Sequence, residues 1–195
     1  MSRFLSLLFL IALSLAGEPA KVTDRGLEVV SITGQTLKPF AIEQRKASVL
    51  FFVTHDCPIS NRYAPEIKRI CENFASKGVS CYLVYSDTGV NAEAISSHYR
   101  EYRHGGYPAI HDQRHQLVKT TGATTTPEAV LVDSTGTIAY RGRIDNAYAT
   151  WGQARGVVTE TDLRDAITAV LAGLKPAAPR TKAVGCYIPA LPLSH

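Results

Sequence analysis

Cys57 has the sequence context of a reactive thiol. It follows an apolar run that begins at Val49, and it directly precedes Pro58, a residue that commonly begins a helix. A thiol at the start of a helix lies at the positive end of the helix dipole, which favours the thiolate over the thiol. Because the thiolate is the nucleophilic form, this position predicts redox chemistry at Cys57 rather than the role of a buried structural thiol.

Three polar neighbours could tune the reactivity of Cys57. Protonated His55 would lower the pKa of the thiol, whereas Asp56 would raise it, and the sequence leaves the balance open. Ser60 is either a hydrogen-bond donor to the thiolate or an ordinary serine in the first turn of a helix. We therefore regard His55 and Ser60 as supporting residues of a site centred on Cys57.

The other three cysteines lie in different contexts. Cys71 falls on the apolar face of a predicted helix and Cys81 on one face of a predicted strand, so both are expected in the core, with a bridge between them left open. Cys186 lies in a tail that extends up to ~46 Å beyond Ala172, which is enough to cross a domain of this size. Cys186 is either an inert or intermolecularly paired cysteine, or the resolving cysteine for Cys57.

The composition is that of one globular domain. The chain has 195 residues, of which 45% are hydrophobic, and a net charge of +4. The basic residues are scattered, so we expect no nucleic-acid partner.

The N-terminus has the pattern of an export signal. Arg3 precedes an apolar stretch from Phe4 to Leu15, and small residues follow as far as Gly17. The stretch is shorter than the ~20 residues that a membrane span needs. We expect a cleaved signal peptide over residues 1–17, with an uncleaved anchor as the alternative, and a mature protein that is periplasmic or secreted.

The hydrophobic periodicity predicts a single α/β domain over residues 18–174, followed by a Pro-rich linker and a Cys-containing tail over residues 175–195. Short apolar pieces on both sides of Gly34 suggest a hairpin or an entry strand. Strands are expected at 48–54, 79–85, 107–111, 128–132 and 137–141, and helices at 58–76, 91–103, 115–121 and 161–171. This order predicts a central mixed sheet with helices on both faces and a C-terminal β-hairpin plus helix. Trp151 and the tyrosines are expected in the core or in a groove.

Two motifs together resemble the thioredoxin-like superfamily. They are the strand–Cys57–helix junction and the segment from Gly122 to Pro127, which a strand follows. The closer likeness is to exported redoxins, namely the membrane-associated thiol–disulfide proteins (TlpA/ResA-like) and the alkyl hydroperoxide reductase/thiol-specific antioxidant (AhpC/TSA) domain. The resemblance implies a thioredoxin-like fold, a cis Pro127 beside Cys57, and a substrate peptide that pairs with the backbone of Thr126.

A second likeness concerns the tail. The stretch from Asp56 to Glu66 and the segment from Thr181 to Ile188 resemble a less characterised group of bacterial redoxins in which these two segments occur together. This resemblance supports a role for Cys186 and names no substrate.

The chain departs from two better-known patterns. Dithiol thioredoxins have a Cys-x-x-Cys loop, but the second position here is Ser60, so the loop alone forms no disulfide. Peroxiredoxins have a Pro-x-x-x-Thr-x-x-Cys pattern, of which Thr54 and Cys57 match and Leu50 does not. Their arginine aligns here with Pro127, and nothing in the spacing makes Arg141 or Arg143 a replacement.

We expect an extracytoplasmic thiol-dependent oxidoreductase with Cys57 as nucleophile, Cys186 as candidate resolving cysteine, and Thr126 and Pro127 as the substrate platform, with Thr54 beside the thiol. Its partners would be a protein thiol or disulfide, or a small peroxide, together with an external reductant, and one of them could lie at the membrane. We expect no cofactor and no metal. The alternatives are a peroxiredoxin-like peroxidase, a copper-binding protein, and a redox-inactive interaction module. His111 and His115 would chelate a metal only if both faced one side of a helix.

Overall fold

A five-stranded mixed sheet forms the centre of the molecule, in the strand order β5-β4-β3-β7-β8. The computed structural model describes residues 20–41, 45–102 and 104–191. The predicted signal peptide, residues 1–17, lies outside these ranges. Strands β3, β4 and β5 are parallel, and β7 runs antiparallel to both β3 and β8. The strands are β3 (Ala47–Val53), β4 (Val79–Tyr85), β5 (Ala109–His111), β7 (Glu128–Asp133) and β8 (Ile138–Gly142).

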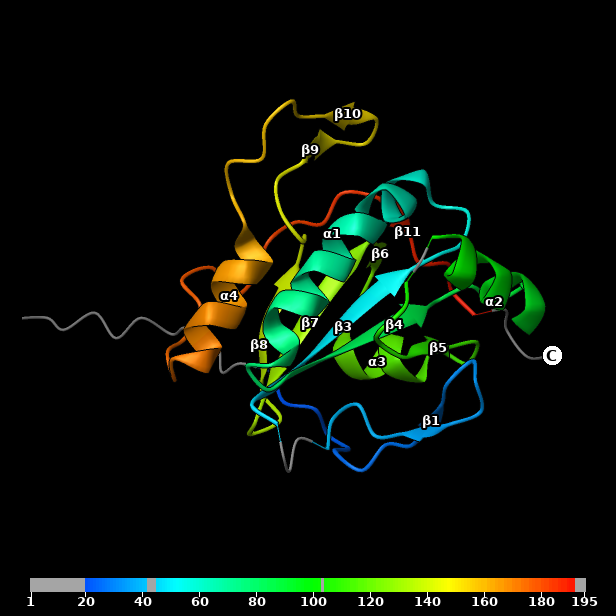
Figure 1. The fold of residues 1–195 in the computed structure, drawn as a ribbon, viewed down its shortest axis with the longest axis horizontal. Helices are drawn as coiled ribbons and strands as arrows, with labels where there is room; N and C mark the ends of the chain where they lie inside the picture. The colour runs from blue at the N-terminus through cyan, green and yellow to red at the C-terminus, as the bar shows by residue number, and fades with distance from the viewer. Residues whose placement is uncertain (1–19, 42–44, 103, 192–195) are drawn as a thin grey trace, which may run out of the picture.

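Helices cover both faces of this sheet, with α1 and α4 in front of it in the view of Figure 1. Buried side chains of α1, α2 and α4 pack in one cluster, and those of α3 pack in the other. The helices are α1 (Pro58–Ala75), α2 (Ala92–Glu101), α3 (Gln116–Thr121) and α4 (Asp162–Leu171). The predicted thioredoxin-like α/β class is therefore confirmed.

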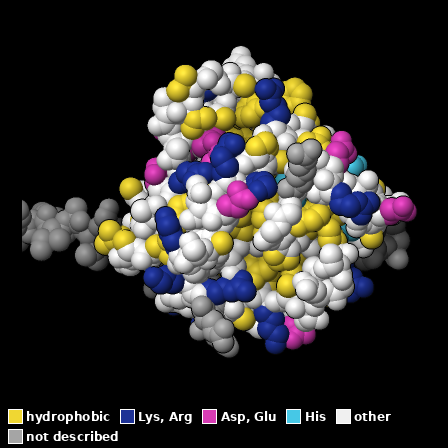
Figure 2. Space-filling model, viewed as in Figure 1, with side chains coloured by type: hydrophobic (Ala, Val, Ile, Leu, Met, Phe, Trp, Pro, Cys, Tyr) yellow, Lys and Arg dark blue, Asp and Glu magenta, His cyan; other side chains and the backbone are white. Residues whose placement is uncertain are grey.

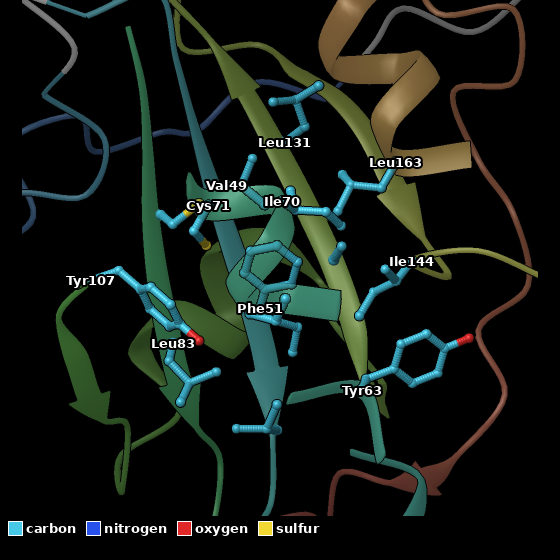
Figure 3. Close-up of a cluster of buried hydrophobic side chains, with 14 of the residues drawn as sticks. Val49, Phe51, Tyr63, Ile70, Cys71, Leu83, Tyr107, Leu131, Ile144 and Leu163 are labelled. Carbon is cyan, nitrogen blue, oxygen red and sulfur yellow. The ribbon is translucent and has the colours of Figure 1, made fainter. Parts of the chain in front are cut away.

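Strand β3 is buried on both faces, which explains its continuous apolar sequence. Val49 and Phe51 point into the cluster that includes Ile70 of α1, as Figure 3 shows, whereas Leu50 and Phe52 point into the other cluster. Successive side chains of a strand alternate between faces, so each layer of the core holds β3 in place. The end of this strand, which leads to Cys57, is thus held rigidly.

Among the described residues, three pairs of short strands lie outside the central sheet. Strands β1 (Val29–Val30) and β2 (Thr36–Leu37) form a hairpin around Gly34, in agreement with the prediction. Strands β9 (Tyr148–Thr150) and β10 (Gln153–Ala154) form a hairpin that the periodicity did not predict. Strand β6 (Thr125–Thr126) pairs with β11 (Cys186–Tyr187), so the tail lies against the domain near the start of α1 (Figure 1).

Two further observations concern exposure and membrane spans. Trp151, at the turn between β9 and β10, is 66% exposed, so of the two expected positions, core or groove, the core is excluded. None of the described helices has the length and hydropathy required to cross a membrane.

Candidate active site

Cys57 is the N-cap residue of α1, and Pro58 occupies the first helical position. The backbone of Cys57 is extended (φ −79°, ψ 110°), and its carbonyl accepts the first helical hydrogen bond, from the amide of Asn61 at 3.0 Å. The side chain is fully buried. The sulfur therefore lies at the positive end of the α1 dipole, as the sequence predicted.

Thr126 and Pro127 lie beside this thiol, and the peptide bond between them is cis. The Cys57 sulfur is 3.2 Å from the carbonyl oxygen of Thr126, to which the neutral thiol donates. The hydroxyls of Thr54 and Thr126 are also 3.2 Å apart, and both side chains are buried. Four predicted residues from two separate segments, Thr54 with Cys57 and Thr126 with Pro127, thus lie in one place.

The tail brings Cys186 to the same place. Cys186 pairs with Thr126 and Tyr187 with Thr125 in an antiparallel ladder. The thiol of Cys186 donates to the sulfur of Cys57 across 2.7 Å, and both cysteines are free thiols in this structure. A disulfide bond of about 2.05 Å requires only a small further approach of the two sulfurs.

Polar contacts on both sides of Cys186 hold the tail. The Thr181 hydroxyl lies 2.5 Å from that of Tyr140 and accepts from the amide of Arg143 at 3.1 Å. Beyond Cys186, the amide of Ile188 donates to the carbonyl of Thr124 at 3.0 Å. The tail is therefore anchored as an added strand and not merely close to the site.

The two thiols have opposite pKa shifts. Burial raises the pKa of Cys57, but hydrogen bonds from the Cys186 thiol and from Ser60 outweigh it, and the result lies below the ordinary value. Burial, the hydrogen bond to Cys57 and the charge of Cys57 raise the pKa of Cys186 to about 12. Cys57 is thus the more acidic thiol of the pair, and Cys186 is the thiol that keeps its proton to higher pH.

Ser60 contributes to this shift through a hydroxyl that is otherwise unused. Its side-chain oxygen is buried and has no hydrogen-bond partner within the described ranges. Ionisation of Cys57 gives this hydroxyl an acceptor, so it lowers the pKa of the thiol. From the sequence alone, this hydrogen-bonding role and the role of an ordinary first-turn serine were equally consistent with Ser60.

His55 interacts with Asp87 instead of with the thiol. Its Nδ1 lies 2.6 Å from Oδ1 of Asp87, a carboxylate that also accepts from the His55 amide at 3.3 Å. Asp87 was missed at the sequence level, although a signal existed. Val53 pairs with Tyr85 in the parallel ladder, so the residues two positions further, His55 and Asp87, end on the same edge of the sheet.

The remaining candidates form no hydrogen bond with Cys57 within the described residues. Cys71 and Cys81 are buried in the core cluster, and burial raises the pKa of Cys71 above its ordinary value. Arg141 pairs with Glu128, and Arg143 with Asp162 and Glu160. Both guanidinium groups are therefore already engaged in ion pairs.

One group of side chains has the composition of a metal site. Donor atoms of His55, Asp56 and Asp87 all lie within 4.8 Å of one another. His111 and His115, in contrast, each use Nε2 for a backbone carbonyl, those of Asp87 and Ser86 respectively. The candidate chelating pair is thus occupied with structural hydrogen bonds.

Trp151 is a neighbour of Cys186 that the sequence did not identify. Although Trp151 is exposed, a hydrogen bond from its indole lowers the pKa of the Cys186 thiol. Burial raises the same pKa, and its effect is larger. Trp151 of the β9–β10 turn therefore lies close to Cys186 of the tail.

The central sheet, the cis-proline and the N-terminal cysteine of α1 define a thioredoxin-like protein. The sequence matches the AhpC/TSA family over residues 16–141, more than half of the chain, and the protein belongs to this family. A comparison with curated proteins gives no match.

Three solved structures illustrate the similarity of fold. A hypothetical protein from Sinorhizobium meliloti has a TM-score of 0.76 and 22% identity, covering 87% of this chain and 92% of that one. An uncharacterised conserved protein from Geobacillus kaustophilus has a TM-score of 0.75 and 22% identity, with coverages of 88% and 93%. A secreted disulfide oxidoreductase from Mycobacterium tuberculosis, homologous to DsbE of Escherichia coli, has a TM-score of 0.53 and 17% identity, with coverages of 76% and 96%.

Proposed function

We propose that this protein is an extracytoplasmic thiol–disulfide oxidoreductase in which Cys57 is the nucleophile and Cys186 the resolving cysteine. The observation that carries the proposal is the 2.7 Å contact between the two sulfurs at the cis-proline. Membership of the AhpC/TSA family supports redox chemistry in general. The signal-like N-terminal sequence, together with the description of the M. tuberculosis structure as secreted, supports a site of action outside the cytoplasm.

The first step is an attack of the Cys57 thiolate on a substrate disulfide. A bond forms between Cys57 and one substrate sulfur, the substrate S–S bond breaks, and the second substrate sulfur leaves as a thiolate that takes up a proton. The lowered pKa of Cys57 increases the thiolate population available for this step.

The second step is the attack of Cys186 on the sulfur of Cys57. Once Cys57 is in the mixed disulfide, the charge and the hydrogen bond that raise the pKa of Cys186 are gone, and burial is the main remaining cause. Cys186 then ionises more readily, bonds to Cys57 and releases the substrate as a thiol. The substrate gains two electrons, and an external reductant restores the dithiol.

The docked tail affects access to the site. Strand β11 pairs with the backbone of Thr126, which is the position at which superfamily members pair with a substrate peptide. A polypeptide substrate that uses this edge has to displace the tail, whereas the tail has to return for the second step. We therefore propose that the tail alternates between docked and undocked positions during turnover.

A counting and trapping experiment tests this proposal. Free thiols of the mature protein are counted before and after mild reduction, and any bridge is mapped by mass spectrometry. We expect a Cys57–Cys186 disulfide after oxidation, loss of disulfide reduction in Cys57→Ser, and an accumulating mixed disulfide in Cys186→Ser. Cys71→Ser is the control and should retain activity. An equal loss in Cys57→Ser and Cys71→Ser would refute the assignment.

Membership of the AhpC/TSA family favours a second candidate function, that of a peroxidase whose oxidant is a peroxide. Cys57 would take one peroxide oxygen to give a sulfenic acid and release an alcohol or water, and Cys186 would condense with it, releasing water. Against this reading, Arg141 and Arg143 are both engaged elsewhere. A sulfenic-acid probe applied to Cys186→Ser after peroxide treatment separates the two functions, because disulfide exchange alone leaves no sulfenic acid.

A further inference from the structure

An open cavity of ≈ 480 Å³ lies beside α1, and no step of the mechanism above uses it. One wall comes from α1, and the opposite wall from β10 and the loop that leads from it to α4. Figure 2 shows Lys/Arg and Asp/Glu side chains gathered over this part of α1, below the β9–β10 hairpin. The cavity has the size of a typical small-ligand site.

The charges around this cavity do not balance. Four arginines and two acidic residues line it. Glu66 pairs with Arg69 at 2.7 Å and with Arg164 at 2.8 Å. Arg62 and Arg155 form no ion pair within the residues that the structure describes, so two guanidinium groups remain for a ligand.

The second acid, Asp145, is buried and already satisfied. Its carboxylate accepts from the Tyr63 hydroxyl at 2.6 Å and from the amide of Ala147 at 2.8 Å. It therefore cannot neutralise the two exposed arginines and instead fixes the orientation of Tyr63. A guanidinium group with no protein partner is suited to bind a carboxylate, with which it forms two parallel hydrogen bonds.

Aromatic rings form the inner wall. The centroids of the Tyr63 and Tyr148 rings lie 5.9 Å apart, and the rings are tilted by 44°. Val158, 42% exposed, adds an aliphatic surface. The cavity thus combines an apolar wall with a positive rim, which matches an organic carboxylate better than an inorganic anion.

The cavity adjoins the reactive centre. A second, much smaller cavity shares Tyr63 and Tyr148 with it, and its lining also includes Pro127 and the tail residue Val184. Arg62 follows Cys57 by five positions on α1, which is a rise of about 7.5 Å along the helix. A peptide attached to Cys57 spans ~10–13 Å with three or four extended residues and so reaches the rim.

We propose that this cavity binds carboxylate groups of the thiol or disulfide substrate that reacts at Cys57. The inference rests on the proposed function and adds a substrate class to it, namely substrates with a negative charge three or four residues from the reactive sulfur. Such carboxylates could belong to acidic side chains of a polypeptide or to a small thiol that carries free carboxyl groups. The chemistry of recognition by Arg62 and Arg155 is the same in both cases.

Two synthetic peptides test the polypeptide source. Each contains one cysteine, activated as a mixed disulfide with 2-thiopyridine, and they differ in having Glu or Gln three and four residues from it. Attack by Cys57 forms the Cys57–peptide disulfide, breaks the bond to the thiopyridine, and releases pyridine-2-thione, whose absorbance gives the rate. The reaction is run in Cys186→Ser, so that it stops after one exchange, and mass spectrometry identifies the modified cysteine.

The small-thiol source is tested with N-acetylated glutathione disulfide and its fully esterified form, in which neither an ammonium nor a carboxylate group remains. For each pair of probes, the quantity measured is the ratio of the rate with carboxylates to the rate without them. We expect a ratio of roughly 3–10 for at least one pair, as one or two partly exposed ion pairs would give, and a smaller ratio at high salt. The pair that shows the preference identifies the source of the carboxylates.

The variants decide whether the cavity causes the preference. Arg62→Gln with Arg155→Gln should bring the ratio close to one. Arg100→Gln with Arg114→Gln removes the same charge from exposed positions outside the cavity lining and should keep the wild-type ratio. A ratio near one in the parent protein, or a preference that survives the Arg62/Arg155 change, would overturn the inference. Failure of Cys57 to react with any probe would instead contradict the proposed function.

Discussion

Gly185 lies so close to Thr126 that a β-carbon on residue 185 would overlap the Thr126 carbonyl group. This carbonyl is the one that faces the Cys57 sulfur. A side chain at position 185 is therefore incompatible with the observed docking of the tail. A substitution at Gly185 can therefore displace Cys186 from Cys57 without changing either cysteine.

Gly185→Ala should slow the closure of the Cys57–Cys186 disulfide. Relief of such an overlap costs about 1–3 kcal/mol, so we expect closure to slow by about 5- to 150-fold. Cys57 should at the same time react faster with an external alkylating reagent, because the tail covers it less often. Quenched time courses of oxidation, analysed by mass spectrometry, measure both effects.

Gly156→Ala is the matched control for this variant. A β-carbon at position 156 would meet no atom within 4 Å, and the residue lies outside the tail. It should close the disulfide at the wild-type rate. Equal closure rates in Gly185→Ala and the wild type would show that the tail does not need this docking to deliver Cys186.

Thr181→Val should weaken the same docking from the other side of Cys186. The Thr181 hydroxyl bonds to Tyr140 and to the amide of Arg143, and Val has nearly the same shape without the hydroxyl. Loss of about 1 kcal/mol of hydrogen bonding should slow disulfide closure by roughly fivefold, less than Gly185→Ala does. Thr36→Val, at an exposed position of β2, is the control, and a slowing there of similar size would argue against the anchor.

The scaffold of the site was predictable because local signals determine it. The apolar run of β3 and the helical periodicity from Pro58 onward placed Cys57 at a strand-to-helix junction, and the structure has both elements within one residue of the expected bounds. The cis-proline beside Cys57 followed from the resemblance to a family and not from the local pattern. Prediction of these features requires only local sequence patterns and one recognised motif.

Tail length and a family resemblance named Cys186 as the candidate resolving cysteine, but the docking of the tail was not predictable, because it depends on fit between distant segments. The length of the tail allowed Cys186 to contact Cys57, but it allowed Cys186 to contact many other positions equally well. The choice among them depends on Gly185 and on a hydrogen-bonding edge at β6 that is two residues long. The β9–β10 hairpin was missed for a similar reason, since its strands are too short to show a periodicity.

Ser60→Ala should raise the pH at which Cys57 becomes reactive. The folded protein lowers the pKa of Cys57 below 9.0, and Ser60 contributes to this by stabilising the thiolate. Removal of the hydroxyl leaves burial, which favours the neutral thiol, with less opposition. The rate of iodoacetamide labelling of Cys57 against pH gives the midpoint. Ser97→Ala, on an exposed part of α2, should leave it in place, and an unshifted midpoint in Ser60→Ala would remove Ser60 from the site.

Acid should destabilise the protein through His104. Burial lowers the pKa of His104 to about 4, whereas the unfolded value is near 6.5. Below pH 6.5 His104 binds a proton in the unfolded chain but not in the folded protein. The free energy of unfolding therefore falls as the pH decreases from about 6.5 to 4. A shift of this size corresponds to about 3 kcal/mol at most.

Urea unfolding at a series of pH values measures this effect, and His104→Asn isolates it. Nδ1 of His104 lies 2.8 Å from the Tyr107 hydroxyl, and an asparagine amide can take either role in this hydrogen bond without titrating. The variant should lose less stability than the wild type between pH 6.5 and 4. A part of the decrease should remain, because burial and then the charge of His55 also lower the pKa of His98. Identical pH profiles in the two proteins would contradict the assignment of this acid sensitivity to His104.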